Sequence, residues 1–143
     1  MKIRELIGQE TPTLSFEVFP PKKDTDFASV EKAAFEIASL KPSYMSVTYG
    51  AGGSTKGLTI KLAEEIQKQH EVPTIAHLTC VCANKEGIKT ALDEMKGAGI
   101  ENILALRGDI PNNYEGEVFT DFAHASELVK FIKENATISK EQG

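Results

Sequence analysis

Four short apolar segments recur about every 30 residues, and this spacing limits the possible fold more than any other feature of the chain. Their aromatic and β-branched composition is typical of strands. We expect strands at residues 14–19, 44–49, 74–79 and 103–107. Stretches with helical spacing separate them, and we expect helices at residues 27–40, 55–70, 84–99 and from about 122 onward. Alternating strands and helices predict a parallel sheet covered by helices.

The pattern inside the strands favours a barrel over an open sheet. In the first strand Phe16 and Val18 alternate with Ser15 and Glu17. Open doubly wound sheets are buried on both faces, whereas one apolar face per strand suits the wall of a (β/α)₈ barrel of the TIM type. A complete barrel takes about 200 residues or more, and the chain has 143. We therefore expect an α/β fold in which residues 1–143 form the N-terminal half of a barrel, about four βα units.

Composition excludes several classes of function. The formal net charge of −5 argues against binding to nucleic acid, which depends on clustered Lys and Arg. Neither the ~20-residue apolar run of a membrane helix nor the apolar stretch of a signal peptide is found, so we expect a cytoplasmic protein without a membrane partner. Cys80 and Cys82 stand too far apart on one strand for a relaxed disulfide, and we expect reduced thiols. With His77 they lack a fourth ligand, so no metal site is expected.

Polar side chains stand near the carboxyl ends of the four expected strands: Glu17, Thr48, His77 and the 107–109 group. Barrel active sites are assembled at that end. A carboxylate within a strand is expensive to bury, so Glu17 needs either a hydrogen-bonding partner or a function. Taken alone, His77 is more often a satisfied core imidazole and Thr48 an ordinary strand residue.

The glycine-rich loop at residues 49–55 connects a strand to a helix, where backbone amides can bind an anion. The loop does not match a dinucleotide fingerprint, because Thr55 stands where the last glycine belongs. It also lacks the Lys-Ser/Thr end of a phosphate-binding Walker loop. A tight turn explains these glycines as well as a ligand does.

Four motifs together resemble the methylenetetrahydrofolate reductase family. They are LSFEVFPPKK at 14–23, LKPSYMSVTYGAGGST at 40–55, AHLTC at 76–80 and GIENILALRGDIP at 99–111. They occur in the family's order, and the resemblance extends to about Phe131. It implies a flavin-dependent barrel enzyme that reduces 5,10-methylenetetrahydrofolate to 5-methyltetrahydrofolate, in one-carbon metabolism and methionine biosynthesis. The implied cofactor is FAD, with NADH or NADPH as electron donor.

The resemblance also implies roles for individual residues. Glu17 becomes the acid that protonates the departing nitrogen of the folate ring, a role for which burial should raise its pKa. Asp109 becomes an ionised carboxylate that stabilises the resulting cation, and Thr48 joins both at the folate. The residues implied at the flavin or the nicotinamide are Thr48, Tyr49, Ala51, His77, Arg107, Gly108, Asp109 and Ala125.

Beyond Phe131 the family continues into a fifth strand, which the residues that follow here do not resemble. Two hypotheses remain open. The chain is either half of an enzyme that becomes competent when the barrel is completed, or a non-catalytic half-barrel that binds flavin or a partner weakly. An open half-barrel leaves strand edges and one sheet face uncovered, so we expect a homo-oligomer or association with a complementary half-barrel.

Overall fold

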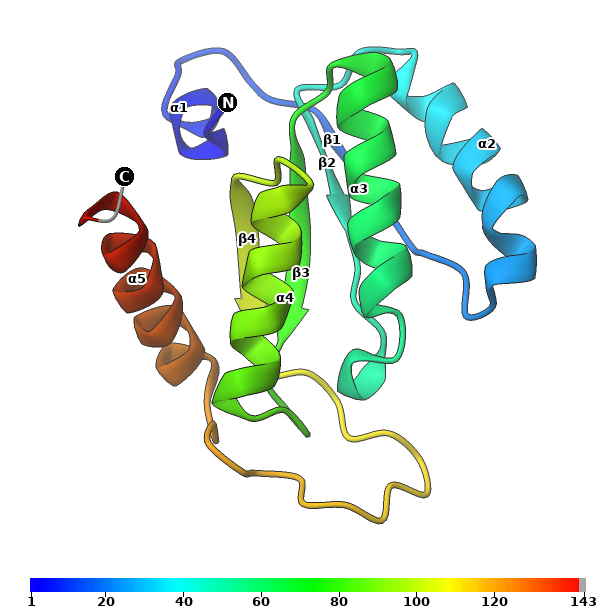
Figure 1. Ribbon diagram of the computed structural model, residues 1–143. Coiled ribbons are helices and arrows are strands. Elements are labelled where there is room, and N and C mark those ends of the chain that lie inside the picture. The colour runs from blue at the N-terminus through cyan, green and yellow to red at the C-terminus, as the bar shows by residue number, and fades with distance from the viewer. Residues whose placement is uncertain (142–143) are drawn as a thin grey trace.

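A single parallel sheet organises the chain in the computed structural model, which describes residues 1–141 (Figure 1). Its strands are β1 (Ser15–Val18), β2 (Tyr44–Val47), β3 (Thr74–Thr79) and β4 (Asn102–Leu106). They lie side by side in the order β1-β2-β3-β4, and every neighbouring pair is parallel. The four expected strands are confirmed. Strand β3 has the predicted bounds, β1 and β2 are shorter than predicted, and β4 begins and ends one residue earlier. Leu14 and Phe19 fall just outside β1 and are largely exposed.

Helices precede the first strand, separate successive strands and follow the last one. They are α1 (Ile3–Ile7), η1 (Asp24–Asp26), α2 (Phe27–Ala38), η2 (Ala51–Gly53), α3 (Lys56–His70), α4 (Lys85–Gly97) and α5 (Ala125–Glu141). Helices α2, α3 and α4 lie on one face of the sheet, and α5 runs alongside β4 (Figure 1). This order of four βα units is the architecture of the first half of a (β/α)₈ barrel, as the sequence predicts.

The hydrophobic core fills the space between the sheet and the helices. From the sheet, Met45, Val47, Ala76 and Leu78 point into it and are fully buried. The helices contribute buried apolar residues at helical spacing, and the sequence pattern identifies them correctly. These residues are Leu62, Ile66, Ile88, Ala91 and Met95. Burial of such side chains contributes about 25 cal/mol per Å² of apolar surface, so this helix-covered face holds the half-barrel together.

Helix α4 begins and ends where the sequence predicts. The side chain of Asn84 accepts a hydrogen bond from the Gly87 amide at 2.8 Å, which satisfies one of the unpaired amides of the first turn. At the other end Gly99 adopts a φ of +73°, and the amide of Ile100 donates to the Met95 carbonyl at 3.0 Å. This glycine closes the helix and directs the chain into β4.

The last helix begins at Ala125, about three residues later than predicted. The Asp121 carboxylate, just before the predicted start, accepts a hydrogen bond from the Lys85 amide of α4 at 2.8 Å. Helix α5 is capped by Glu127, whose carboxylate accepts from the amides of Ala123 and His124 at 2.6 and 2.9 Å. These two hydrogen bonds lower the pKa of Glu127.

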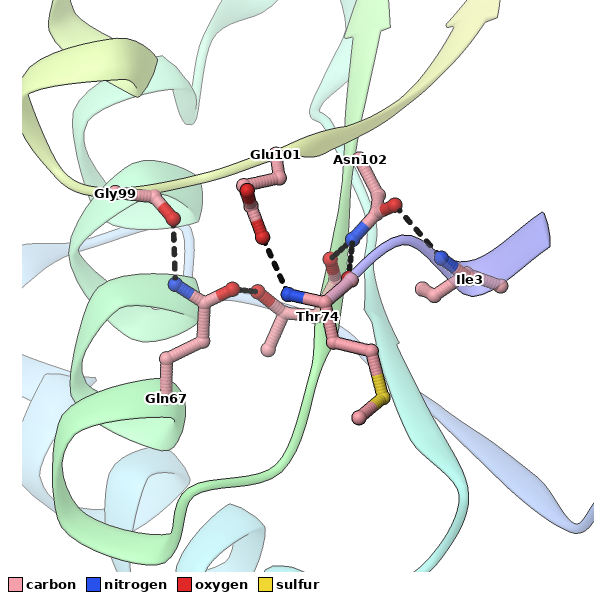
Figure 2. Close-up of polar contacts among 7 residues, drawn as sticks. Ile3, Gln67, Thr74, Gly99, Glu101 and Asn102 are labelled. Carbon is pink, nitrogen blue, oxygen red and sulfur yellow. Dashed lines mark hydrogen bonds and ion pairs between the residues drawn. The ribbon is translucent and has the colours of Figure 1, made fainter. Parts of the chain in front are cut away.

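Helix α1, which the sequence pattern does not predict, docks at the amino ends of β3 and β4 through the side chain of Asn102 (Figures 1 and 2). The Asn102 side-chain oxygen accepts from the Ile3 amide at 3.0 Å. Its amide group donates to the carbonyls of Met1 and Thr74 at 3.0 and 3.2 Å. Ile3 is buried beneath this contact. Among the described residues, none of the helices is long and apolar enough to cross a membrane.

Candidate functional site

Three polar side chains from three adjacent strands meet on the sheet face that the helices do not cover. Glu17 of β1 is in register with Ser46 of β2, and Ser46 is in register with Ile75, two residues before His77 on β3. Residues two apart on a strand share a face, so Glu17, Ser46 and His77 line the same side of the sheet. In a closed barrel this side faces the interior.

The Ser46 hydroxyl joins the other two groups directly. Its Oγ lies 2.6 Å from Nε2 of His77 and 3.2 Å from Oε2 of Glu17. The direct separation between His77 Nε2 and Glu17 Oε2 is 3.5 Å. Glu17 thus has a hydrogen-bonding partner on β2 and a close polar neighbour on β3.

His77 and Glu17 differ sharply in their exposure to solvent. The His77 side chain is 8% exposed and that of Glu17 is 50% exposed. Burial lowers the pKa of His77, and the nearby Glu17 carboxylate only partly opposes this effect, so the imidazole is held in its neutral form at neutral pH. The burial expected for Glu17 is not supplied by the described residues, because the sheet face on which Glu17 lies has no opposite wall here.

The loop after β2 is held in place by a series of hydroxyl groups. The amide of Gly50 donates to Thr55 Oγ1 at 2.7 Å, and Thr55 Oγ1 lies 3.2 Å from Thr59 Oγ1. Thr59 in turn donates to the carbonyl of Thr48 at 2.8 Å. These bonds fix Thr48 and Gly50 at the carboxyl end of β2, and they account for the start of α3 just beyond it.

Tyr49 belongs to this loop, but its side chain lies apart from the Glu17, Ser46 and His77 cluster. It borders a pocket of about 250 Å³ between the amino ends of α3 and α4, together with residues that include Lys56 and Asn84. Burial, and to a lesser degree the Glu94 carboxylate, raises the pKa of its phenol. Among the described residues, the ring of Tyr49 therefore packs towards the helix layer.

The segment after β4 brings the predicted residues Arg107, Gly108 and Asp109 to the same end of the sheet. The Arg107 carbonyl accepts hydrogen bonds from the amides of Cys80 and Val81 at 3.2 and 2.8 Å, which ties this segment to the end of β3. Arg107 and Asp109 are exposed. Within the described part of the chain, no hydrogen bond links Asp109 to the cluster around Ser46.

The remaining predicted residues lie at the same edge of the sheet without joining the cluster. Ala51 is exposed in η2, and Ala125 is half-buried at the first turn of α5. Residue Ser46 is the one that the sequence reasoning missed. The signal for it was present, because Ser46 occupies a polar position of the alternating second strand.

Within residues 1–141, neither cysteine forms a disulfide or belongs to a cluster of metal-binding side chains. Cys80 and Cys82 are both free thiols, and Cys80 is buried among the core residues. Burial raises the pKa of the Cys80 thiol. In residues 1–141, no three His, Cys, Asp or Glu side chains gather closely enough to hold a metal ion.

Comparison with known proteins identifies relatives along nearly the whole chain. The sequence profile named Methylenetetrahydrofolate reductase matches residues 2–139. The chain is 40% identical over 141 residues to Methylenetetrahydrofolate reductase 2 of Schizosaccharomyces pombe, an alignment with 94% of the chain and 22% of the relative. It is 39% identical over 134 residues to Methylenetetrahydrofolate reductase (NADH) 1 of Zea mays, covering 92% of the chain and 23% of the relative.

A bacterial relative is shorter. The chain is 33% identical over 141 residues to 5,10-methylenetetrahydrofolate reductase of Pectobacterium carotovorum subsp. carotovorum, with 92% of the chain and 45% of the relative aligned. The chain thus spans less than half the length of each of these three relatives.

Proposed function

Because the chain belongs to the methylenetetrahydrofolate reductase family, we propose that it forms the N-terminal half of a barrel that reduces 5,10-methylenetetrahydrofolate to 5-methyltetrahydrofolate. The observation that carries this proposal is the cluster of Glu17, Ser46 and His77 on the inner face of the sheet. It brings the Ser46 hydroxyl within hydrogen-bonding reach of both a carboxyl group and a neutral imidazole, on the face that lines the interior of a closed barrel.

The donor groups at this edge suit a flavin adenine dinucleotide. The Arg107 guanidinium is exposed and uses one N–H group on its neighbour, the Gly108 carbonyl at 3.3 Å, so its other donors are available to a pyrophosphate. The neutral His77 ring is a hydrogen-bonding group without a charge. A bound flavin would supply the hydride. Thr48, Tyr49, Ala51, Gly108, Asp109 and Ala125 complete the proposed flavin and nicotinamide contacts.

Two carboxyl groups take different parts in the proposed reaction. Glu17 donates a proton to the ring nitrogen of the folate that departs when the five-membered ring opens. Asp109 remains ionised and stabilises the positive charge that this opening creates. Substrate, together with the second half of the barrel, would bury the exposed half of the Glu17 side chain. Thr48 directly follows the next strand, β2, and is the third proposed contact to the folate.

The electron donor is proposed as NADH or NADPH. The relative from Zea mays carries NADH in its name. A role in one-carbon metabolism and methionine biosynthesis would follow from the product, and the expected cytoplasmic location and single half-barrel domain remain predictions.

A second candidate function is a half-barrel that binds flavin or a partner without turnover. The observation that favours it is the uncovered inner face, where Glu17 remains half exposed and Leu104 of β4 is 42% exposed. A site in this state lacks the water-excluding wall that acid catalysis by a carboxyl group needs.

Titration of the purified chain with FAD tests the flavin site. We expect quenching of flavin fluorescence with saturable, one-to-one binding. Arg107→Met should weaken this binding roughly ten-fold or more, because a charge-assisted hydrogen bond contributes about 1.5–3 kcal/mol. Lys89→Met removes one positive charge from the exposed face of α4 and should leave binding unchanged. Equal loss in both variants, or no binding by the unaltered chain, would contradict the proposed flavin site in this half of the barrel.

A further inference from the structure

Ser46 has one hydroxyl proton and two titratable neighbours, so the direction of its hydrogen bonds depends on their protonation. An ionised Glu17 can only accept, and Ser46 Oγ then donates to Glu17 Oε2 across 3.2 Å. The contact of 2.6 Å between Ser46 Oγ and His77 Nε2 must in that case be donated by the imidazole. A neutral His77 therefore carries its proton on Nε2 while Glu17 is ionised.

Protonation of Glu17 reverses both hydrogen bonds. The carboxylic acid can donate to Ser46 Oγ, which frees the Ser46 proton to be donated to Nε2 of His77. A ring nitrogen that accepts cannot carry a proton, so the neutral ring then carries its proton on Nδ1. The direct separation of 3.5 Å between His77 Nε2 and Glu17 Oε2 is too long for a good hydrogen bond, so the hydroxyl is the shorter connection.

We propose that the Ser46 hydroxyl is a proton bridge through which the protonation state of Glu17 sets the tautomer of His77. Ser46 is thus a positioning residue that acts through its two neighbours. The proposal rests on the proposed function only where it assigns a use to the Glu17 proton. The coupling itself is a property of three side chains of this chain.

The bridge also provides a balanced route for returning a proton to Glu17 after it has been given up. A proton from water binds Nδ1 of His77, the Nε2 proton passes to Ser46 Oγ, and the original Ser46 proton passes to the Glu17 carboxylate. One proton enters and one is gained by Glu17. The ring is left neutral with its proton on Nδ1, the tautomer that accompanies a protonated Glu17, and exchange with water restores the Nε2 form once Glu17 has given up its proton again.

The surroundings of His77 leave Glu17 as the charged group that acts on it. From β1 it faces Glu17, whose charge opposes the lowering of the His77 pKa by burial. From β2 it faces Ser46, which does not titrate in this range. On β4 its register partner is the apolar Leu104, and Arg107 and Asp109 follow only after that strand has ended.

Ring ¹⁵N chemical shifts of the ligand-free chain test the bridge at about pH 7.5, above the usual pKa of histidine. We expect mostly the Nε2–H tautomer for His77 in the unaltered chain. Glu17→Gln replaces the acid by a neutral group that can donate to Ser46, and it should invert the population towards Nδ1–H. The rings of His70 and His124 serve as internal controls, whose tautomers should not respond.

Removal of the Ser46 hydroxyl should uncouple the tautomer of His77 from the residue at position 17. In Ser46→Ala the tautomer of His77 should be the same whether position 17 is Glu or Gln, and Ser46→Thr should restore the dependence. An identical tautomer in the unaltered chain and in Glu17→Gln would overturn the proposal, as would a switch that persists in Ser46→Ala. If Ser46→Ala does not fold, the proposal is decided by the comparison of the unaltered chain with Glu17→Gln and by the same comparison in the Ser46→Thr background.

These results separate the bridge from the proposed function. A tautomer that responds as expected supports the bridge even in a chain that fails to bind flavin, and such a failure refutes only the flavin proposal. A tautomer that ignores position 17 in a chain that binds flavin refutes only the bridge.

Discussion

Gly108 lies so close to Thr79 that no side chain fits between them. A Cβ atom on Gly108 would lie 2.7 Å from Cβ and 2.8 Å from Cγ2 of Thr79, and Gly108 adopts a φ of +87°. The contact presses the segment after β4 against the end of β3. It thereby fixes the point at which Arg107 and Asp109 leave the sheet.

Gly108→Ala should destabilise the chain by about 2–4 kcal/mol, because it combines overpacking with an unfavourable backbone conformation. Two other glycines separate these causes. Gly99→Ala keeps only the conformational cost, since φ is +73° but no atom lies within 4 Å, and Gly97→Ala meets neither obstacle. Gly97→Ala should be neutral or stabilising by up to about 1 kcal/mol. Urea denaturation measures the free energy of unfolding of all three variants. Equal losses in Gly108→Ala and Gly99→Ala would show that the Thr79 contact is unimportant.

Asn102→Ala should detach α1 from the sheet. The change leaves the amide of the buried Ile3 without its side-chain acceptor and removes the side-chain hydrogen bond to the Thr74 carbonyl, which should lower the free energy of unfolding by about 1–3 kcal/mol. Hydrogen exchange should accelerate first in residues 3–7. Asn112→Ala, at an exposed loop position, is the matched control and should change stability by less than about 0.5 kcal/mol. Unchanged exchange in α1 would contradict the anchoring role of Asn102.

The contrast between α4 and α1 shows what the sequence could and could not predict. Helix α4 has an N-cap at Asn84, an apolar stripe and a closing Gly99, and its bounds are predicted closely. Helix α1 has one turn of apolar spacing and is held by Asn102, about 100 residues away. A contact so distant in sequence leaves no local pattern.

The same limit applies to the candidate site. Polar residues at strand ends predicted Glu17 and His77, since periodicity places them on one face. The hydroxyl that joins them depends on the register between β1, β2 and β3, which the spacing of single strands does not determine. The left-handed backbone conformation of Lys41 and Glu71 could not be predicted from the sequence either, because glycine is the residue that normally indicates it.

The pKa of His77 predicts how stability depends on pH. Burial lowers this pKa in the folded chain below its usual value near 6.5. In the unfolded chain His77 therefore binds protons more readily, so its contribution to stability is complete above about pH 6.5 and is lost as the pH falls towards the folded pKa. His77→Gln should flatten the dependence of unfolding free energy on pH over that range. Parallel curves for the unaltered chain and for His77→Gln would show that His77 is not coupled to folding.

The uncovered sheet face predicts self-association. Leu104 is 42% exposed on β4, in register with His77 and therefore on the side away from the helices. Sedimentation over a concentration series should show reversible association driven by such apolar surface. Leu104→Lys should weaken it, while Leu40→Lys, at a position 74% exposed next to the end of α2, should not. A compact monomer at high concentration would contradict the account of an open half-barrel.

The central claim is that Glu17 donates a proton to the folate in a completed barrel. Residues 2–139 can replace the aligned segment of the Pectobacterium carotovorum relative, so that the remainder of that protein completes the chimera. Stopped-flow absorbance then follows the two half-reactions separately. In Glu17→Gln, reduction of the flavin by the nicotinamide should remain close to that of the unaltered chimera, since it requires no proton on the folate. Reduction of methylenetetrahydrofolate should fall by roughly 10²- to 10⁴-fold. Equal loss in both half-reactions would contradict the claim and make Glu17 a structural residue.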